Sequence, residues 1–218
     1  MESRTARGRT LSTLCWALGI PMVAVAAGFL TQYPYGGLWV GVVVVLAVVA
    51  AAAIMAGGVW NRAGAATLAS SVVLALPMFA GPTLYEVYAK RLGTPVDAVV
   101  LGTGQDRNSK GTALDTCSVA DTSGERSTLS ERQNCHGQFA VGAHVVLFKD
   151  PAGLLDPWVQ ETRSRSVDTV SLPISAGLFA TAAGTLLYAG LRRRTDAQKA
   201  RQARRTYGPP RPSVEDYE

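Results

Sequence analysis

Charge is missing from four long stretches of this 218-residue chain. No Asp, Glu, Lys, Arg or His occurs in residues 11–30, 38–57, 65–84 and 170–190, and apolar side chains dominate each stretch. At about 1.5 Å of rise per residue, roughly 20 residues of α-helix cross a hydrocarbon core of about 30 Å. A globular protein of this length has too little polar chain left to cover four buried helices. The sequence therefore predicts four transmembrane helices.

The same absence bears on function. Ionisable side chains within a membrane usually mark ion pathways, proton relays or intramembrane catalytic sites, and the four apolar stretches contain none. Ser70, Ser71 and Cys15 have no basic partner there that could activate them as nucleophiles. A role as a component of a membrane transporter or channel is therefore an alternative that no residue in the apolar stretches supports.

Cysteine and histidine are also scarce, with three and two residues respectively. Cys117, Cys135, His136 and His144 all lie in the one long polar region. Cys135 and His136 are adjacent, which is a poor geometry for chelating one ion, and no further ligand has the spacing of a zinc module. No sequence motif identifies a catalytic Ser-His-Asp triad. The sequence thus predicts no metal site, no cofactor and no catalytic residue.

The polar region, residues 87–168, has the pattern of a small β-domain. Residues that favour turns separate short extended runs, which are residues 96–101, 112–120, 125–130, 143–148 and 158–163. Together with the apolar stretches, this pattern predicts a membrane protein of four transmembrane α-helices. A small all-β domain, barrel- or sandwich-like, is inserted between helices 3 and 4.

A disulfide between Cys117 and Cys135 is expected to staple this domain. A core of about 80 residues is only marginally stable alone, and such domains commonly carry a covalent crosslink. An oxidised pair is favoured outside the cytoplasm. The alternative is a redox-active dithiol, but such pairs usually have the spacing Cys-x-x-Cys at a helix start, and these two cysteines are eighteen positions apart.

Lysine and arginine predict the orientation. Basic residues occur in residues 1–10, at Arg62 and in residues 192–218, whereas residues 31–37 carry no charge. With three helices in residues 11–86 and a fourth in residues 169–191, all basic segments fall on one side, which the positive-inside rule assigns to the cytoplasm. We expect a multi-pass cell-membrane protein with cytoplasmic N- and C-termini and an extracytoplasmic β-domain.

Three further interpretations concern the first span, the net charge and the tail. A cleaved signal peptide is an alternative for the first span, although its apolar run is longer than usual. The net charge of +5 is explained by topology, so no nucleic-acid partner is expected. The tail is expected to be basic and then disordered.

Small and basic residues mark the last span and its end. Ala176, Ala180 and Gly184 form a small-residue stripe of the kind that lets helices approach closely. The stripe predicts either packing within the four-helix bundle or a homodimer. The basic cluster that follows is expected to contact anionic lipid headgroups of the bilayer or to act as a stop-transfer anchor; it consists of Arg192, Arg193 and Arg194.

Residues Phe139–Trp158, FAVGAHVVLFKDPAGLLDPW, are similar to the closing segment of a family of uncharacterised bacterial integral membrane proteins. The run GTPVDAVVLGTG resembles the first strand of that family's small β-domain, and DTCSVADTSG with RQNCHG resembles a disulfide-bearing subgroup from high-GC, actinobacterial-type bacteria. The resemblance implies a small extracytoplasmic β-domain between transmembrane helices. His144 stands where an acidic residue is common, and the family has no established activity to transfer.

These observations favour a non-enzymatic membrane protein that displays a disulfide-stapled β-domain for interaction, envelope assembly or sensing. Its expected partners are the lipid bilayer and a protein of unknown identity. An extracytoplasmic enzyme is the further alternative, for which His136 and His144 are the only ready bases.

Overall fold

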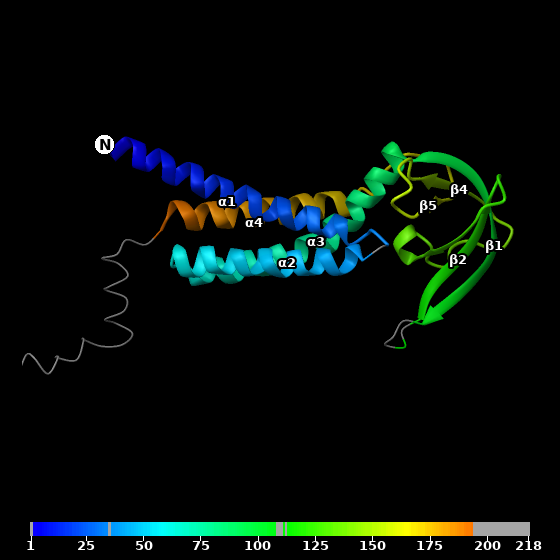
Figure 1. The fold of residues 1–218 in the computed structure, drawn as a ribbon, viewed down its shortest axis with the longest axis horizontal. Coiled ribbons are helices and arrows are strands. Elements are labelled where there is room, and N and C mark those ends of the chain that lie inside the picture. Colours follow the sequence, from blue (N-terminus) through cyan, green and yellow to red (C-terminus); the bar gives the residue numbers. More distant parts are fainter. Residues whose placement is uncertain (1, 35, 108–110, 112, 194–218) are drawn as a thin grey trace, which may run out of the picture.

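The computed structural model describes residues 2–34, 36–107, 111 and 113–193. Its helices are α1 (Glu2–Leu30), α2 (Gly37–Ala53), a π-helical turn η1 (Ile54–Val59), α3 (Ala63–Leu92), a short 3-10 helix η2 (Glu131–Gln133) and α4 (Ser171–Leu191). Its strands are β1 (Thr94–Arg107), β2 (Ala113–Asp121), β3 (Arg126–Ser130), β4 (His144–Lys149) and β5 (Trp158–Gln160). The prediction of four membrane-length helices with a β-domain between the third and fourth is confirmed (Figure 1).

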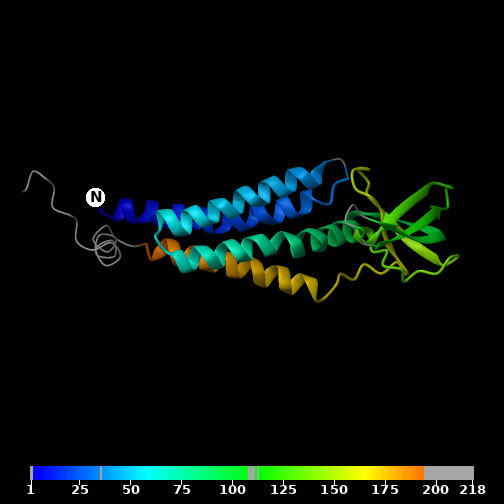
Figure 2. The ribbon, with the colours of Figure 1, turned by 90° about the horizontal axis from the view of Figure 1, so that it is seen from below.

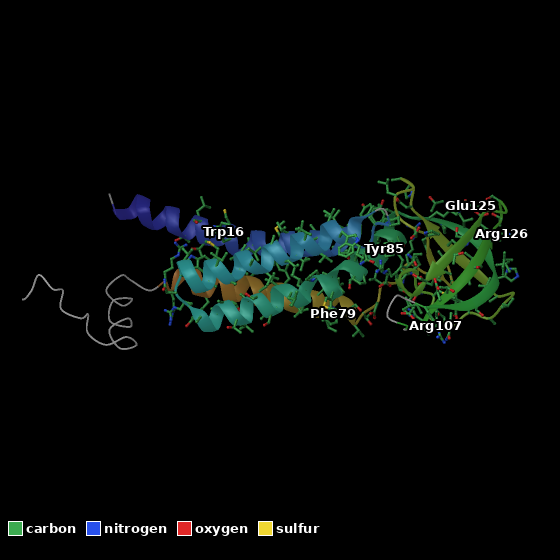
Figure 3. All side chains as sticks on the ribbon, turned by 60° about the horizontal axis from the view of Figure 1, so that its bottom comes forward. Trp16, Phe79, Tyr85, Arg107, Glu125 and Arg126 are labelled. Atoms are coloured by element: carbon green, nitrogen blue, oxygen red, sulfur yellow. A yellow bond between two sulfur atoms is a disulfide. The ribbon has the colours of Figure 1, made fainter. Side chains whose placement is uncertain are left out.

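The helices form a bundle whose outer surface is apolar. Val73, Leu76 and Leu186 fill its centre and are fully buried. Trp16 and Phe79, which Figure 3 shows projecting from the bundle, are 41% and 44% exposed. A continuous apolar exterior of this kind marks a surface that contacts lipid. The chain is therefore a multi-pass membrane protein.

Small residues bring α1 and α3 close together. A Cβ atom added at Gly28 would lie 2.8 Å from Pro77, and one added at Gly81 would lie 2.5 Å from the Gly28 carbonyl oxygen. Both positions therefore require glycine, as at other close helix crossings in membranes. This contact could not be predicted from the sequence, because its two glycines lie on different helices.

The predicted stripe lies on the outward side of α4. Ala176, Ala180 and Gly184 are exposed, while Ala182 and Leu186 face the interior and are fully buried. These exposures give no support to packing of the stripe within the bundle, and that interpretation stays a prediction. The homodimer alternative stays a prediction.

The β-domain lies at the end of the bundle opposite the N-terminus (Figures 1 and 2). Helix α3 continues well beyond the apolar stretch that predicted it, as far as Leu92, and Gly93 alone separates it from β1. Helix and sheet are thus joined without a flexible linker.

The five antiparallel strands form one curled sheet, a half-barrel, in the order β3-β2-β1-β4-β5. The long central strand β1 pairs with β4 through residues 94–99 and with β2 through residues 98–107. Its register with β2 shifts between Val100 and Gly102, and a bulge of this kind increases bending of a strand. The sheet therefore curves around a core on its concave face (Figure 1).

Strand β4 is buried on both faces. Val145 and Leu147 belong to the core inside the sheet, whereas Val146 and Phe148 pack with Ala89 near the end of α3. Side chains of a strand point alternately to opposite faces, so one strand contacts both the domain core and the helix. This double contact fixes the β-domain to the bundle.

The predicted disulfide is present. Cys117 on β2 is bonded to Cys135, which follows η2, and both residues are 0% exposed. The bond therefore ties a central part of the sheet to the loop that follows the short helix.

Candidate functional site

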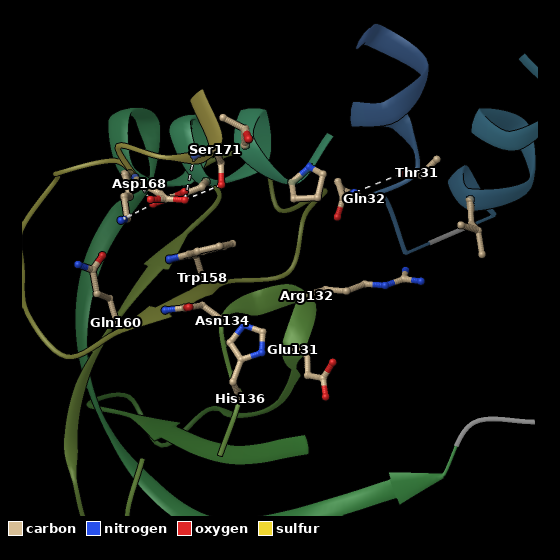
Figure 4. Close-up of a pocket in the computed structure, with 15 residues that line it drawn as sticks. Thr31, Gln32, Glu131, Arg132, Asn134, His136, Trp158, Gln160, Asp168 and Ser171 are labelled. Carbon is tan, nitrogen blue, oxygen red and sulfur yellow. Dashed lines mark hydrogen bonds and ion pairs between the residues drawn. The ribbon is translucent and has the colours of Figure 1, made fainter. Parts of the chain in front are cut away.

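A polar cleft of about 680 Å³ lies between the β-domain and the ends of the helices (Figure 4). The β-domain contributes six lining residues, Glu131, Arg132, Asn134, His136, Trp158 and Gln160. Helix α3, the ends of α1 and α2, and the segment that enters α4 supply the rest. We call this hollow the interfacial cleft.

One wall of the interfacial cleft is built by η2 and the loop after it. The side chains of Ser130 and Gln133 bond to each other's backbone in a capping box, which starts the short helix. Asn134 ends it with a left-handed backbone, φ 69°, and its side-chain amide donates to the Val159 carbonyl oxygen at 2.9 Å. Because the next residue is Cys135, the disulfide anchors this wall.

A second wall is β5. Trp158 and Gln160 are two residues apart, so they point to the same face of the strand, and both line the cleft. The Trp158 ring packs edge-on against Tyr85 of α3, with centroids 5.5 Å apart. The Tyr85 hydroxyl donates to the Asp156 carbonyl oxygen at 2.6 Å. These contacts hold β5 against the helix.

Two polar atoms on β5 have no hydrogen-bond partner among the described residues. They are Nε1 of Trp158, a donor, and Oε1 of Gln160, an acceptor, and both are shielded from water. An unpaired buried polar atom costs about 1–3 kcal/mol. The two atoms are unsatisfied inside the wall, where water in the cleft does not reach them.

Beside these walls lies a buried ion pair on α3. Lys90 Nζ is 2.6 Å from Glu86 Oε1, and the two side chains are only 7% and 11% exposed. Lys90 also donates to the Ser166 carbonyl oxygen at 2.6 Å, and the Asp168 backbone N–H donates to Glu86 Oε1 at 3.1 Å. The pair thus connects α3 to the segment that leads into α4.

Asp168 begins α4. Hydrogen bonds from the Ser171 hydroxyl and from the backbone N–H groups of Val170 and Ser171 hold the pKa of the Asp168 carboxyl below its usual range. The carboxylate therefore stays charged at neutral pH and fixes one edge of the cleft (Figure 4).

The charges that line the cleft nearly balance. Three carboxylates, Glu86, Glu131 and Asp168, face two cations, Lys90 and Arg132. Glu131 accepts a hydrogen bond from the Asp115 backbone, and Lys90 is paired with Glu86. Arg132 is exposed and, among the described residues, makes no ion pair within 4.0 Å. The cleft is therefore polar without a strong field of either sign.

An apolar groove of about 310 Å³ adjoins the cleft between α1, α3 and α4. Its lining includes Ala80, Leu172, Ala176 and Phe179. Thr83 lines both the groove and the cleft. The polar and the apolar hollow are thus neighbours.

The structure separates the two histidines. His136 lines the interfacial cleft, whereas His144, at the start of β4, borders a different hollow with Asp97 and Glu161. Among the described residues, no group of three or more His, Cys, Asp or Glu side chains could hold a metal ion.

The basic residues after α4 are at the far end of the bundle. Arg193 donates to the hydroxyl of Thr13 at 2.8 Å and lies 5.2 Å from the ring centroid of Trp60. Arg62 donates to the Arg192 carbonyl oxygen. Arg192 is exposed, so it is available to lipid headgroups, while Arg193 is engaged within the protein. Arg194 and the tail lie outside the described residues.

Most residues of the cleft were missed from the sequence. One part of the cleft could have been recognised in the sequence, because Glu86 and Lys90 have the i, i+4 spacing of a helical ion pair. Nothing local marks Trp158 and Gln160, since they line a cleft only after β5 has paired at the sheet edge beside α3.

We compared the chain with protein-family models, curated proteins and solved structures, and none matches it. No family is therefore identified, and the resemblance of Phe139–Trp158 to a family of bacterial membrane proteins stays a prediction. What stands is the architecture of four apolar helices with a five-stranded half-barrel between α3 and α4.

Proposed function

We propose that this protein is a membrane-anchored binding protein that displays its β-domain outside the cytoplasm, for interaction, envelope assembly or sensing. The observation that carries the proposal is the interfacial cleft, a hollow of about 680 Å³ lined by polar and charged side chains of both the β-domain and the helix ends. Concave sites with a few convergent polar groups are the usual binding sites of proteins.

Binding explains the cleft better than catalysis does. A general base needs a neighbouring group to orient it and a nucleophile or substrate proton within reach. Among the described residues, none donates a hydrogen bond to the imidazole of His136 or accepts one from it, and the carboxylates of Glu86 and Asp168 are engaged in structural contacts. We therefore propose a non-enzymatic role.

The orientation rests on charge. The basic residues Arg62, Arg192 and Arg193 lie together at the end of the bundle opposite the β-domain. By the positive-inside rule this end faces the cytoplasm. The β-domain then faces the oxidising compartment in which its disulfide is stable.

Cysteine labelling tests this orientation. In a Cys15→Ala background, a membrane-impermeant maleimide should label Thr122→Cys in intact cells, because Thr122 is exposed in the β2–β3 turn. Gly64→Cys, exposed near the start of α3, should react only after permeabilisation. The reverse pattern of labelling would place the β-domain in the cytoplasm and contradict the proposal.

Photo-crosslinking tests binding at the cleft. A benzophenone amino acid in place of His136, which lines the cleft, should yield one discrete adduct when full-length protein is irradiated in native membranes. The matched control is Trp39, which is 74% exposed near the same end of the bundle but outside the cleft. Equal adducts from both positions, or none from either, would show that the cleft holds no specific ligand.

A further inference from the structure

The interfacial cleft opens sideways to the bilayer. Leu38, near the start of α2, and Pro82 of α3 line the cleft and belong to membrane-spanning helices. Leu38 is 39% exposed and Pro82 is exposed as well, so the lipid around the helices reaches this part of the lining. Thr83, the next residue of α3, also borders the apolar groove. A lipid headgroup can therefore enter the cleft while its acyl chains remain among hydrocarbon.

The polar part of the cleft lies at the height of lipid headgroups. Thr31 and Gln32 directly follow α1, Ser171 begins α4, and all three line the cleft. Outside a hydrocarbon core of about 30 Å, each leaflet has a polar headgroup layer about 5–7 Å thick. Polar side chains at the ends of membrane-spanning helices lie where this layer begins. The cleft therefore faces the headgroups of the leaflet on the side of the β-domain.

Two neighbouring charges on η2 have bonding capacity that the protein does not use. Arg132 is exposed, and Figure 4 shows it extending from η2 toward Thr31 and Gln32. Among the described residues, it makes no ion pair and no side-chain hydrogen bond. Glu131 accepts a hydrogen bond from the Asp115 backbone N–H on Oε1 at 3.2 Å, and no described residue contacts its Oε2 in this way. A cation and a carboxylate oxygen thus remain available side by side.

The other charged residues of the cleft are engaged within the protein. Lys90 and Glu86 form a buried ion pair with each other. The Asp168 carboxylate accepts hydrogen bonds from the backbone of Val170 and from the backbone and hydroxyl of Ser171. The charges left for a ligand are therefore those of η2, one of each sign.

One charge of each sign fits a zwitterionic headgroup. A guanidinium group binds phosphate through two parallel hydrogen bonds, and a carboxylate accepts hydrogen bonds from an ammonium group. Consecutive Cα atoms are about 3.8 Å apart, and in phosphoethanolamine a link of only two carbons separates the phosphate from the ammonium. An anionic head without ammonium would leave its phosphate beside Glu131, and the trimethylammonium of choline has no N–H to donate.

We infer that the protein binds phosphatidylethanolamine from the leaflet next to the β-domain, with the phosphate on Arg132 and the ammonium on Glu131. This inference rests on the proposed binding function and names its ligand class. The lateral opening at Leu38 and Pro82 admits the lipid, and the two η2 side chains select its headgroup.

Native mass spectrometry tests the inference on the full-length protein. The protein is placed in nanodiscs that contain equal fractions of phosphatidylethanolamine, phosphatidylcholine and phosphatidylglycerol with identical acyl chains. We expect retained phosphatidylethanolamine to exceed each of the other two lipids by about tenfold, the effect of one charge-assisted hydrogen bond at a partly exposed site.

Substitutions on η2 separate the two contacts. Arg132→Gln should lower retention of phosphatidylethanolamine about tenfold. Its matched control is Arg126→Gln, since Arg126 is exposed on β3 and Figure 3 shows it at the side of the β-domain away from the bundle. Glu131→Gln keeps an oxygen for the Asp115 N–H, so it should preserve the fold but lower the preference over phosphatidylcholine about tenfold. Formation of the Cys117–Cys135 disulfide in every variant checks folding.

Each other outcome has a definite meaning. Equal retention of the three lipids, or an excess of phosphatidylglycerol, would overturn the ethanolamine headgroup. Soluble glycerophosphoethanolamine that binds as tightly as the lipid would show a soluble ligand and overturn the lipid. Either result leaves the binding function standing if residue 136 still gives its discrete crosslink, whereas loss of that crosslink as well removes the proposed function.

Discussion

Replacing Lys90 by methionine should lower the free energy of unfolding by about 3 kcal/mol. The Lys90 ammonium lies 2.6 Å from Glu86 Oε1, and both side chains are buried. Without Lys90, the Glu86 carboxyl stays buried and loses its partner, and this unpaired buried group is the main cost. Thermal unfolding of the purified protein in detergent micelles measures the loss.

An exposed ion pair provides the control. Arg163 and Asp97 also form a pair, but their side chains are 64% and 56% exposed, so Arg163→Met should cost less than about 1 kcal/mol. The double variant Glu86→Gln/Lys90→Met should recover part of the loss, because it leaves no buried charge. Equal losses from Lys90→Met and Arg163→Met would show that burial of the α3 pair does not matter.

Replacing Cys117 and Cys135 by alanine should destabilise the β-domain by about 3 kcal/mol, since the bond closes a loop with a sequence separation of 18. Both residues are 0% exposed in the domain core, so the substitutions also remove packed sulfur atoms. Limited proteolysis of the protein in membranes should then cut the β-domain while the helices stay protected.

Cys15→Ala serves as the control, because Cys15 is a free, exposed cysteine on α1 and its loss should leave proteolysis unchanged. Since Cys135 lies between Asn134 and His136, two lining residues of the cleft, the double alanine variant should also lose the crosslink from residue 136. A β-domain that remains resistant to protease in the absence of the bond would contradict the role of the disulfide as a staple.

The fold was predictable because its signals are local. The absence of charge over membrane-length runs identified four helices, and turn residues separated five strands at nearly the observed places. β1 is longer than expected, since its bulge lets one strand pair with two partners that bend away from each other. β5 is shorter than expected and stops at Gln160.

The cleft could not be predicted, because it depends on the placement of one unit against another. Trp158, Gln160 and Asn134 lie beside α3 because β4 packs on Ala89 with one face, and because Trp158 itself packs against Tyr85. No periodicity in the sequence reports such a contact. The role of the stripe on α4 is open for a related reason, since small residues occur both on the exposed and on the buried face of this helix.

The unequal lengths of α3 and α4 set the height of the β-domain above the bilayer. Helix α3 has 30 residues and α4 has 21, which correspond to about 45 Å and about 32 Å. The shorter helix matches the hydrocarbon core, and the excess of α3 holds the β-domain at a fixed height above it. A bilayer thicker or thinner than the apolar length of the helices would move the lipid headgroups relative to the β-domain. Bilayer thickness therefore sets the position of the cleft relative to the headgroup layer, and host lipids with longer or shorter acyl chains would move that layer along α3.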